Sequence, residues 1–229
     1  MLNSISIIIP VYNEPNINYY LEDLYSKLPK KLNYEIIVVD GAENGSTLSL
    51  IETKKTRGFL ASPGRATQQN FGADIAKKDI LLFLHADTIL PNDFSNLIIS
   101  TINSGYDCGA FELEIKTNSR TLKLFTKVAL IRSRLTKHPY GDQALFFTRS
   151  SFEMIGGFPE ISLMEDIAIM QQAKKQKLRL RILTQKVMTS DRKYQKDGVI
   201  YSLLRNPILA SLYYLGVDPE WLHKIYYKN

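Results

Sequence analysis

Two aspartates follow apolar, β-branched runs, where an α/β protein places groups that bind ligands. Asp40 comes directly after the run 35–39, and Asp87 follows the run 79–84 by three residues. In an open parallel sheet, ligands bind beyond the carboxyl ends of the strands. A carboxylate there can hydrogen-bond a nucleobase or ribose, or coordinate a divalent cation. A lone aspartate is more often a turn or cap residue, but two at neighbouring strand ends favour a ligand site.

The elements that must position these carboxylates alternate between strand and helix along the first hundred residues. Continuous β-branched runs predict strands that are buried on both faces, and apolar residues on one stripe predict helices between them. Repeated units of this kind predict an α/β fold with a mainly parallel, Rossmann-like sheet flanked by helices. The predicted strands are 5–9, 35–39, 57–61 and 79–84, and the predicted helices are 17–28 and 64–77, with a short helix starting at Ser46.

The second half of the chain is less regular. The pattern predicts strands at 108–115, 144–148 and 178–183, an amphipathic helix at 122–135 and a helix at 164–175. There is no internal repeat and no flexible linker. We therefore expect one catalytic domain over residues 1–190, with residues 191–229 as a helical extension of the same domain.

Composition bears on the cellular compartment of the protein and on the partners it can attract. The single cysteine, Cys108, excludes an intrachain disulfide, and the absence of a secretory signal also favours the cytoplasm. Residues 170–229 carry twelve Lys or Arg and four Asp or Glu, a net charge of +8 within a total of +6. A basic surface can attract nucleic acid, a phosphorylated substrate or an anionic membrane, or it can simply be solvated. Nucleic acid is not expected, because the basic residues lack the aromatic interleaving of a recognised motif.

The apolar segment 198–217 contains one charge, Arg205, followed by Asn206 and Pro207. A charge and a helix breaker near its middle argue against a membrane-spanning helix. Three alternatives stay open: packing on the domain, a homodimer contact, or peripheral membrane contact through an interfacial helix that reaches a lipid-linked acceptor.

Four motifs occur in order over residues 4–176. They are Pro10-Val11-Tyr12-Asn13-Glu14, Val38-Val39-Asp40-Gly41, His85-Ala86-Asp87, and Glu165-Asp166 behind Gly156-Gly157-Phe158. The ordered set resembles the family 2 glycosyltransferases, although each motif alone is weak. The segments around His85, Gly141 and Asp166 resemble a narrower bacterial branch, called transferase 2, radical-SAM/selenodomain-associated.

The resemblance implies a GT-A fold and a nucleotide-diphosphate sugar, UDP- or GDP-linked, as donor. Asp40 would contact the base, and as a loop carboxylate it is expected to contribute little to the core. Arg65, at a helix N-terminus, could hold phosphate or form a surface salt bridge. The implied donor nucleotide-binding residues are Pro10, Tyr12, Glu14, Asp40, Arg65, His85 and Ala86.

The resemblance also assigns the metal and the base. Asp87 would bind Mn²⁺ or Mg²⁺ on the diphosphate. Asp166 would be the catalytic base in an inverting displacement, and the helix dipole would favour its ionised form. Glu165 and Asp142 are candidates for the acceptor side, although both acidic residues at 165–166 could merely complement the dipole and Gly141-Asp142 could be a turn.

Two departures from the family pattern bear on function. His85 replaces the first acidic residue of Asp-X-Asp, and no second aspartate follows Asp40, where Glu43 could substitute. The His85 departure keeps a non-catalytic nucleotide-sugar-binding protein open as the alternative. A nucleotidyltransferase would need a glycine-rich basic loop after the first strand, which Pro10 to Glu14 does not provide.

Overall fold

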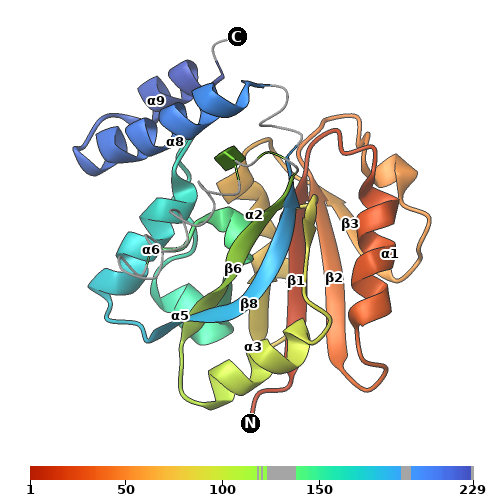
Figure 1. Cartoon of the computed structure of the whole chain (residues 1–229). Coiled ribbons are helices and arrows are strands. Elements are labelled where there is room, and N and C mark those ends of the chain that lie inside the picture. The colour runs from red at the N-terminus through yellow and green to blue at the C-terminus, as the bar shows by residue number, and fades with distance from the viewer. Residues whose placement is uncertain (118, 120, 123–137, 192–196, 228–229) are drawn as a thin grey trace.

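The computed structural model describes residues 1–229 except 118, 120, 123–137, 192–196 and 228–229. An eight-stranded mixed sheet with the order β3-β2-β1-β4-β7-β6-β8-β5 forms its centre (Figure 1). The strands are β1 Ser4–Val11, β2 Asn33–Asp40, β3 Thr56–Leu60, β4 Ile80–Phe83, β5 Thr88–Ile89, β6 Cys108–Lys116, β7 Phe146–Thr148 and β8 Leu180–Ser190. The predicted mainly parallel α/β sheet is therefore confirmed.

The N-terminal half of the sheet is parallel throughout. β1 pairs with β2 and with β4, and β2 pairs with β3, all in parallel register. Alternate side chains of β1 enter opposite cores: Ile7 packs with α1 and α3 residues, while Ile8 packs with α2 residues. Because both faces are covered, the strands need continuous apolar runs, and runs of that kind can be recognised in the sequence.

Helices cover the two faces of the sheet. α1 (Ile17–Lys27) and α3 (Phe94–Asn103) contribute to one core cluster, and α2 (Arg65–Ile75), α5 (Arg149–Met154) and α6 (Glu165–Lys175) contribute to the other. α1 buries Ile17, Leu21 and Leu24, which recur at helical spacing. The predicted helices 17–28, 64–77 and 164–175 are thus confirmed to within two residues at each end. At residue 46 the structure instead has a 3₁₀ turn, Leu48–Leu50.

The C-terminal half of the sheet departs further from the predictions. β8 runs to Ser190, seven residues beyond the predicted end at 183, and pairs in parallel with β6. β5, α3 and α5 were not predicted at all. The predicted helix 122–135 lies outside the described residues, apart from Leu122.

Two helices, α8 (Val199–Tyr214) and α9 (Pro219–Tyr226), follow the sheet and lie against each other at one end of the molecule (Figure 1). α8 continues through Pro207. Leu209 of α8 and Leu222 of α9 are buried against Leu163, so the pair packs on the loop before α6. No described helix is long and apolar enough to cross a membrane. Whether residues 191–229 count as an extension of the same domain stays a prediction.

Candidate active site

The loop after β2 is organised by Asp40. One carboxylate oxygen accepts the backbone N–H of Ala42 at 2.9 Å, and the other accepts those of Thr47 at 2.9 Å and Leu48 at 3.3 Å. The residue is fully buried. The expectation that Asp40 contributes little to the core is therefore wrong, because its carboxylate is the acceptor that holds this loop in shape. Its contact with a nucleobase stays a prediction.

The loop after β1 is tied to the loop after β2. The backbone N–H of Glu14 donates to Thr47 Oγ1 at 3.0 Å, and Ser46 Oγ bonds to the Asn13 side chain. Tyr12 is exposed, whereas Pro10 and Glu14 are half-buried. The structure thus places the two loops predicted to bind the nucleotide side by side at the carboxyl ends of β1 and β2.

Sequence reasoning missed the residue that joins these two strand ends. Gln68 Nε2 in α2 donates to the carbonyls of Val11 at 2.8 Å and Val39 at 2.7 Å. A Cβ atom at Gly41 would lie 2.9 Å from Gln68 Oε1, so the glycine makes room for this contact. The only sign of this contact in the sequence is that Gln68 is a polar residue on the buried side of a predicted helix. The sequence does not show which partner such a residue binds.

A second group of residues gathers around Gly141. Its backbone N–H donates to Asp166 Oδ2 at 2.8 Å, and Asp166 Oδ1 accepts the N–H of Ile167 at 2.8 Å. A Cβ atom at Gly141 would lie 3.2 Å from His85 Nε2 and 3.5 Å from Asp166 Oδ2. Residues from three separate motifs, 85, 141 and 166, are therefore brought together, and the carboxylate predicted to be the base is held by two N–H donors.

The turn that supplies Gly141 is fixed by another residue that the sequence analysis missed. Residues Gly141–Gln143 form a 3₁₀ turn, in which Tyr140 N–H donates to Gln143 Oε1 at 3.0 Å. The Gln143 amide donates to the carbonyl of Phe111 at 2.8 Å, which anchors the turn to β6. Asp142 is half-buried in the same turn, so the alternative of a Gly-Asp turn is confirmed and its acceptor role stays a prediction.

The start of α6 carries an ion pair that reaches back to α2. Glu165 Oε1 lies 3.1 Å from Arg65 Nη1, and the Glu165 side chain is 5% exposed while that of Arg65 is 46% exposed. Burial raises the pKa of Glu165 although Arg65 opposes the shift. Burial alone would lower the pKa of Arg65, but the carboxylates of Glu165 and Asp166 outweigh it and raise the pKa. Arg65 thus forms the salt bridge that the sequence left open, and its phosphate contact stays a prediction.

The residues that precede Arg65 and Glu165 have left-handed backbone conformations. Gly64 precedes α2 with φ 139°, a conformation that favours glycine, and Met164 precedes α6 with φ 71°. A left-handed non-glycine residue costs on the order of 1 kcal/mol and persists only when its surroundings hold it. Met164 packs against the α8–α9 cluster, which supplies that support beside Asp166.

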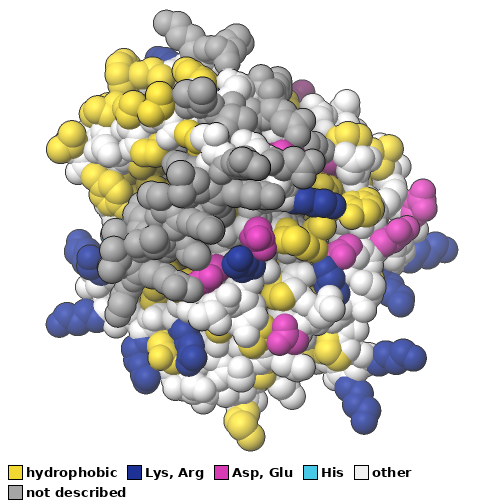
Figure 2. Space-filling view, viewed as in Figure 1, with side chains coloured by type: hydrophobic (Ala, Val, Ile, Leu, Met, Phe, Trp, Pro, Cys, Tyr) yellow, Lys and Arg dark blue, Asp and Glu magenta, His cyan; other side chains and the backbone are white. Residues whose placement is uncertain are grey.

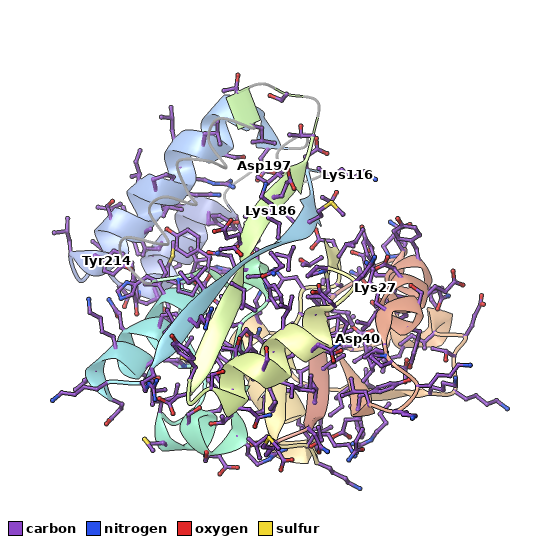
Figure 3. The ribbon with its side chains drawn as sticks, turned by 60° about the horizontal axis from the view of Figure 1, so that its bottom comes forward. Lys27, Asp40, Lys116, Lys186, Asp197 and Tyr214 are labelled. Atoms are coloured by element: carbon purple, nitrogen blue, oxygen red, sulfur yellow. The ribbon has the colours of Figure 1, made fainter. Side chains whose placement is uncertain are left out.

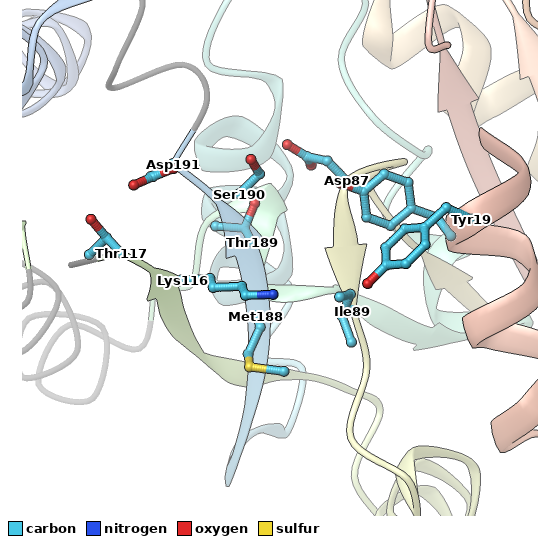
Figure 4. Close-up of a pocket in the computed structure, with 10 residues that line it drawn as sticks. Tyr19, Asp87, Ile89, Lys116, Thr117, Met188, Thr189, Ser190 and Asp191 are labelled. Atoms are coloured by element: carbon cyan, nitrogen blue, oxygen red, sulfur yellow. The ribbon is translucent and has the colours of Figure 1, made fainter. Parts of the chain in front are cut away.

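A cavity of about 450 Å³ opens beside Asp87 (Figure 4). Its lining includes Asp87, Lys116, Ser190 and Asp191. β5 pairs antiparallel with the end of β8, Thr88 opposite Thr189, which brings residues 87 and 190 to the same place. Figure 3 shows Lys116 at the far end of β6, well away from Asp40. Ala86, between His85 and Asp87, packs against the core.

The residues around this cavity fit the divalent cation that the family implies. Among the described residues, no three His, Cys, Asp or Glu side chains gather as a complete metal site. Mg²⁺, however, is usually held by one or two carboxylates together with substrate phosphates and water. Asp87 supplies a hard oxygen ligand of that kind at the cavity, so this residue suits a cation that arrives with a diphosphate.

Comparisons with known solved structures show a similar fold. TarS of S. aureus, residues 1–349 in complex with UDP-GlcNAc, has a similar structure, with a TM-score of 0.66, 19% identity, and coverage of 88% of this chain and 64% of TarS 1–349. TarS in a longer form matches with a TM-score of 0.64 and 19% identity, over 88% of this chain and 38% of that one. The chain therefore spans less than two thirds of these proteins. No curated protein matches the sequence.

The family comparison is more direct. The glycosyl transferase family 2 model matches residues 6–152, about two thirds of the chain, and includes the motifs around Asp40 and Asp87 but not Asp166. With the TarS similarity it confirms the predicted GT-A-like fold. The narrower bacterial branch stays a prediction. The buried strands, the loops at their carboxyl ends and the matching sequence together show that this chain belongs to glycosyl transferase family 2.

Proposed function

We propose that the chain transfers a sugar from a nucleoside diphosphate sugar to an acceptor hydroxyl, with inversion at the anomeric carbon. The observation that carries this proposal is the arrangement around Gly141. Asp166, held by two backbone N–H donors, lies beside His85, whose segment continues to Asp87 at the neighbouring cavity. A carboxylate next to a diphosphate site is what a direct displacement needs.

The reaction needs one base and one leaving-group site. The Asp166 carboxylate accepts the proton of the acceptor hydroxyl as the acceptor oxygen bonds to the anomeric carbon. The bond between that carbon and the diphosphate oxygen breaks, and its electron pair leaves with the diphosphate. The N–H donors of Gly141 and Ile167 orient the carboxylate before the acceptor arrives, which lowers the entropic cost of the encounter.

The leaving diphosphate carries negative charge that must be stabilised. We assign Asp87, which lines this cavity, to hold Mn²⁺ or Mg²⁺. When bound, such an ion neutralises charge on the phosphate oxygens. Arg65 keeps half of its side chain exposed while it pairs with Glu165, so further N–H groups of its guanidinium remain available to a phosphate. A uridine diphosphate sugar is the first donor to test, because TarS was solved with UDP-GlcNAc.

The base assignment is tested with Asp166→Asn. The asparagine keeps the shape but cannot accept a proton, and general-base catalysis contributes about 10²–10⁴-fold. We expect kcat for sugar transfer to fall by that factor while donor affinity, measured by calorimetry, changes little. Transfer at the wild-type rate would exclude Asp166 as the base. Donor binding without turnover in the wild-type protein, over a broad set of acceptors, would support a binding protein instead.

The metal assignment is tested by titrating UDP into the protein with Mn²⁺ and then with EDTA. We expect Mn²⁺ to strengthen binding in the wild-type protein and to have little effect in Asp87→Ala. The matched control is Asp93→Ala, which removes an exposed aspartate that follows the same segment of chain. If EDTA left UDP affinity and turnover unchanged, the assignment of a metal to Asp87 would be wrong.

A further inference from the structure

The α8–α9 pair presents large apolar side chains to solvent. Tyr201, Leu204 and Ile208 on α8, Leu215 at its C-terminal cap and Trp221 on α9 are 46–81% exposed. We call these five residues the apolar face. In Figure 2 hydrophobic side chains gather in the upper left of the view, over the helices labelled α8 and α9 in Figure 1. Single exposed apolar residues are normal on a soluble protein, but several of them gathered on one helix pair indicate an interaction surface.

The spacing shows that these side chains share one side of the helix pair. Residues 201, 204, 208 and 215 are separated by three, four and seven positions, which is one stripe of an α-helix. Tyr201, Leu204 and Ile208 line a shallow groove of about 260 Å³ together with Ile225 of α9. Trp221 lies one turn before Ile225, so it belongs to the same side.

Other side chains of the pair hold the helices in place. Leu209 and Leu222 are buried against Leu163. Arg205 forms a buried ion pair with Asp197 at 2.9 Å, and its guanidinium lies 4.2 Å from the ring centre of Tyr226. The described contacts that attach α8 and α9 therefore do not depend on Leu204, Ile208, Leu215 or Trp221, and these side chains remain exposed.

The chemistry of the face favours a lipid surface. Arg205 is the only charged residue in α8, and it is buried. Of the five side chains, only Tyr201 and Trp221 carry polar atoms, and such amphipathic rings concentrate where a membrane meets water. The segment 191–229, which contains the pair, also carries six Lys or Arg and four Asp or Glu, a net charge of +2, which an anionic surface attracts.

The size of the face argues against a stable dimer. A specific protein interface buries about 800 Å² on each partner. Even at the roughly 250 Å² of the largest aromatic side chains, five residues that are 46–81% exposed offer less than that. An interfacial helix needs only to insert its apolar side into the headgroup region.

We propose that the apolar face lies on an anionic membrane surface, and that the acceptor hydroxyl belongs to a lipid-linked molecule held there. The second part rests on the proposed transferase function. The face is close to the proposed base, because Leu163 and Met164, which pack against Leu209 and Leu222, directly precede Glu165 and Asp166 in the chain. A membrane under α8–α9 would therefore present a headgroup hydroxyl beside the start of α6.

The test is flotation of the full chain with vesicles of phosphatidylglycerol and phosphatidylcholine in equal parts, against phosphatidylcholine alone. We expect binding that is stronger on the anionic vesicles. The double variant Leu204→Ser, Ile208→Ser should bind at least about tenfold more weakly, because each lost apolar side chain contributes more than a factor of ten when fully buried. Met154→Ser is the matched control, since Met154 is 64% exposed on α5, and it should bind as the wild type does.

Three results would overturn the proposal. The first is that the wild-type chain does not float, and the second is that it floats equally with both kinds of vesicle. The third is a dimer in light scattering that the double variant abolishes, because that result would assign the face to a second copy of the chain. Equal melting temperatures of the three proteins show that the variants fold. Hydrolysis of the donor sugar by a protein that does not float would reject the membrane surface and leave the transferase function standing. Flotation of a protein that binds no nucleotide sugar would support the membrane surface and reject the transferase function.

Discussion

Asp40 shows how a single buried carboxylate can shape a binding loop. Asp40→Ala leaves the N–H groups of Ala42, Thr47 and Leu48 without their acceptor. Each buried donor left unsatisfied costs about 1–3 kcal/mol, so with three donors we expect the free energy of unfolding to fall by at least about 3 kcal/mol. Chemical denaturation measures this. Glu43→Ala, in the exposed part of the same loop, should change it little, and equal stability of the two variants would mean that the loop does not depend on Asp40.

Glu165 makes stability depend on pH through its raised pKa. The folded state holds the proton more tightly than the unfolded state, so this contribution is present below the unfolded pKa, about 4.3. It is lost as pH rises from there through the folded pKa. We expect the melting temperature of wild type minus that of Glu165→Gln to fall over this interval. The exposed Glu160→Gln is the control, and a flat difference for Glu165→Gln would contradict the raised pKa.

The packing of α2 on the sheet depends on close approach at Gly72. A Cβ atom there would lie 2.5 Å from Ile8 Cγ2 and 3.3 Å from Val39 Cγ2. Alanine would gain about 1 kcal/mol of helix propensity, but overpacking a full core costs about 1–3 kcal/mol. We therefore expect Gly72→Ala to lower the free energy of unfolding, while Asp74→Ala on the exposed side of α2 does not. Equal or higher stability of Gly72→Ala would show that α2 can move outward at little cost.

The elements that could be predicted are those whose sequence pattern fits one kind of structure. β1, β2 and β4 are buried on both faces, so their apolar runs are continuous and unambiguous. β5 has only two residues, which is below what any periodicity can reveal. β8 alternates buried and exposed residues beyond Leu183, and its polar exposed positions hid the strand. α3 carries Phe94 and Ile98 at helical spacing, a signal that was present and missed.

On the scale of the whole molecule, the sheet order decides what meets at the site. β4 pairs antiparallel with β7, which follows the Gly141 turn, and β6 lies between β7 and β8. This order places residues from positions 85, 141 and 166 within a few ångströms of one another. Tyr214 and Asp40 lie on opposite sides of the view in Figure 3, and the α8–α9 pair packs against Leu163 and Met164 at the start of α6.

The sequence by itself indicated the α/β fold, its early strands and the family, because buried strands and strand-end motifs depend on residues close in the chain. Only the tertiary structure decided that Asp40 binds the N–H groups of its own loop, that Arg65 pairs with Glu165, and that Gln68 and Gln143 fasten the site. Each of these contacts joins a polar side chain to a partner that its local sequence does not specify. Such a side chain has many possible partners, and only the packing of distant segments selects one.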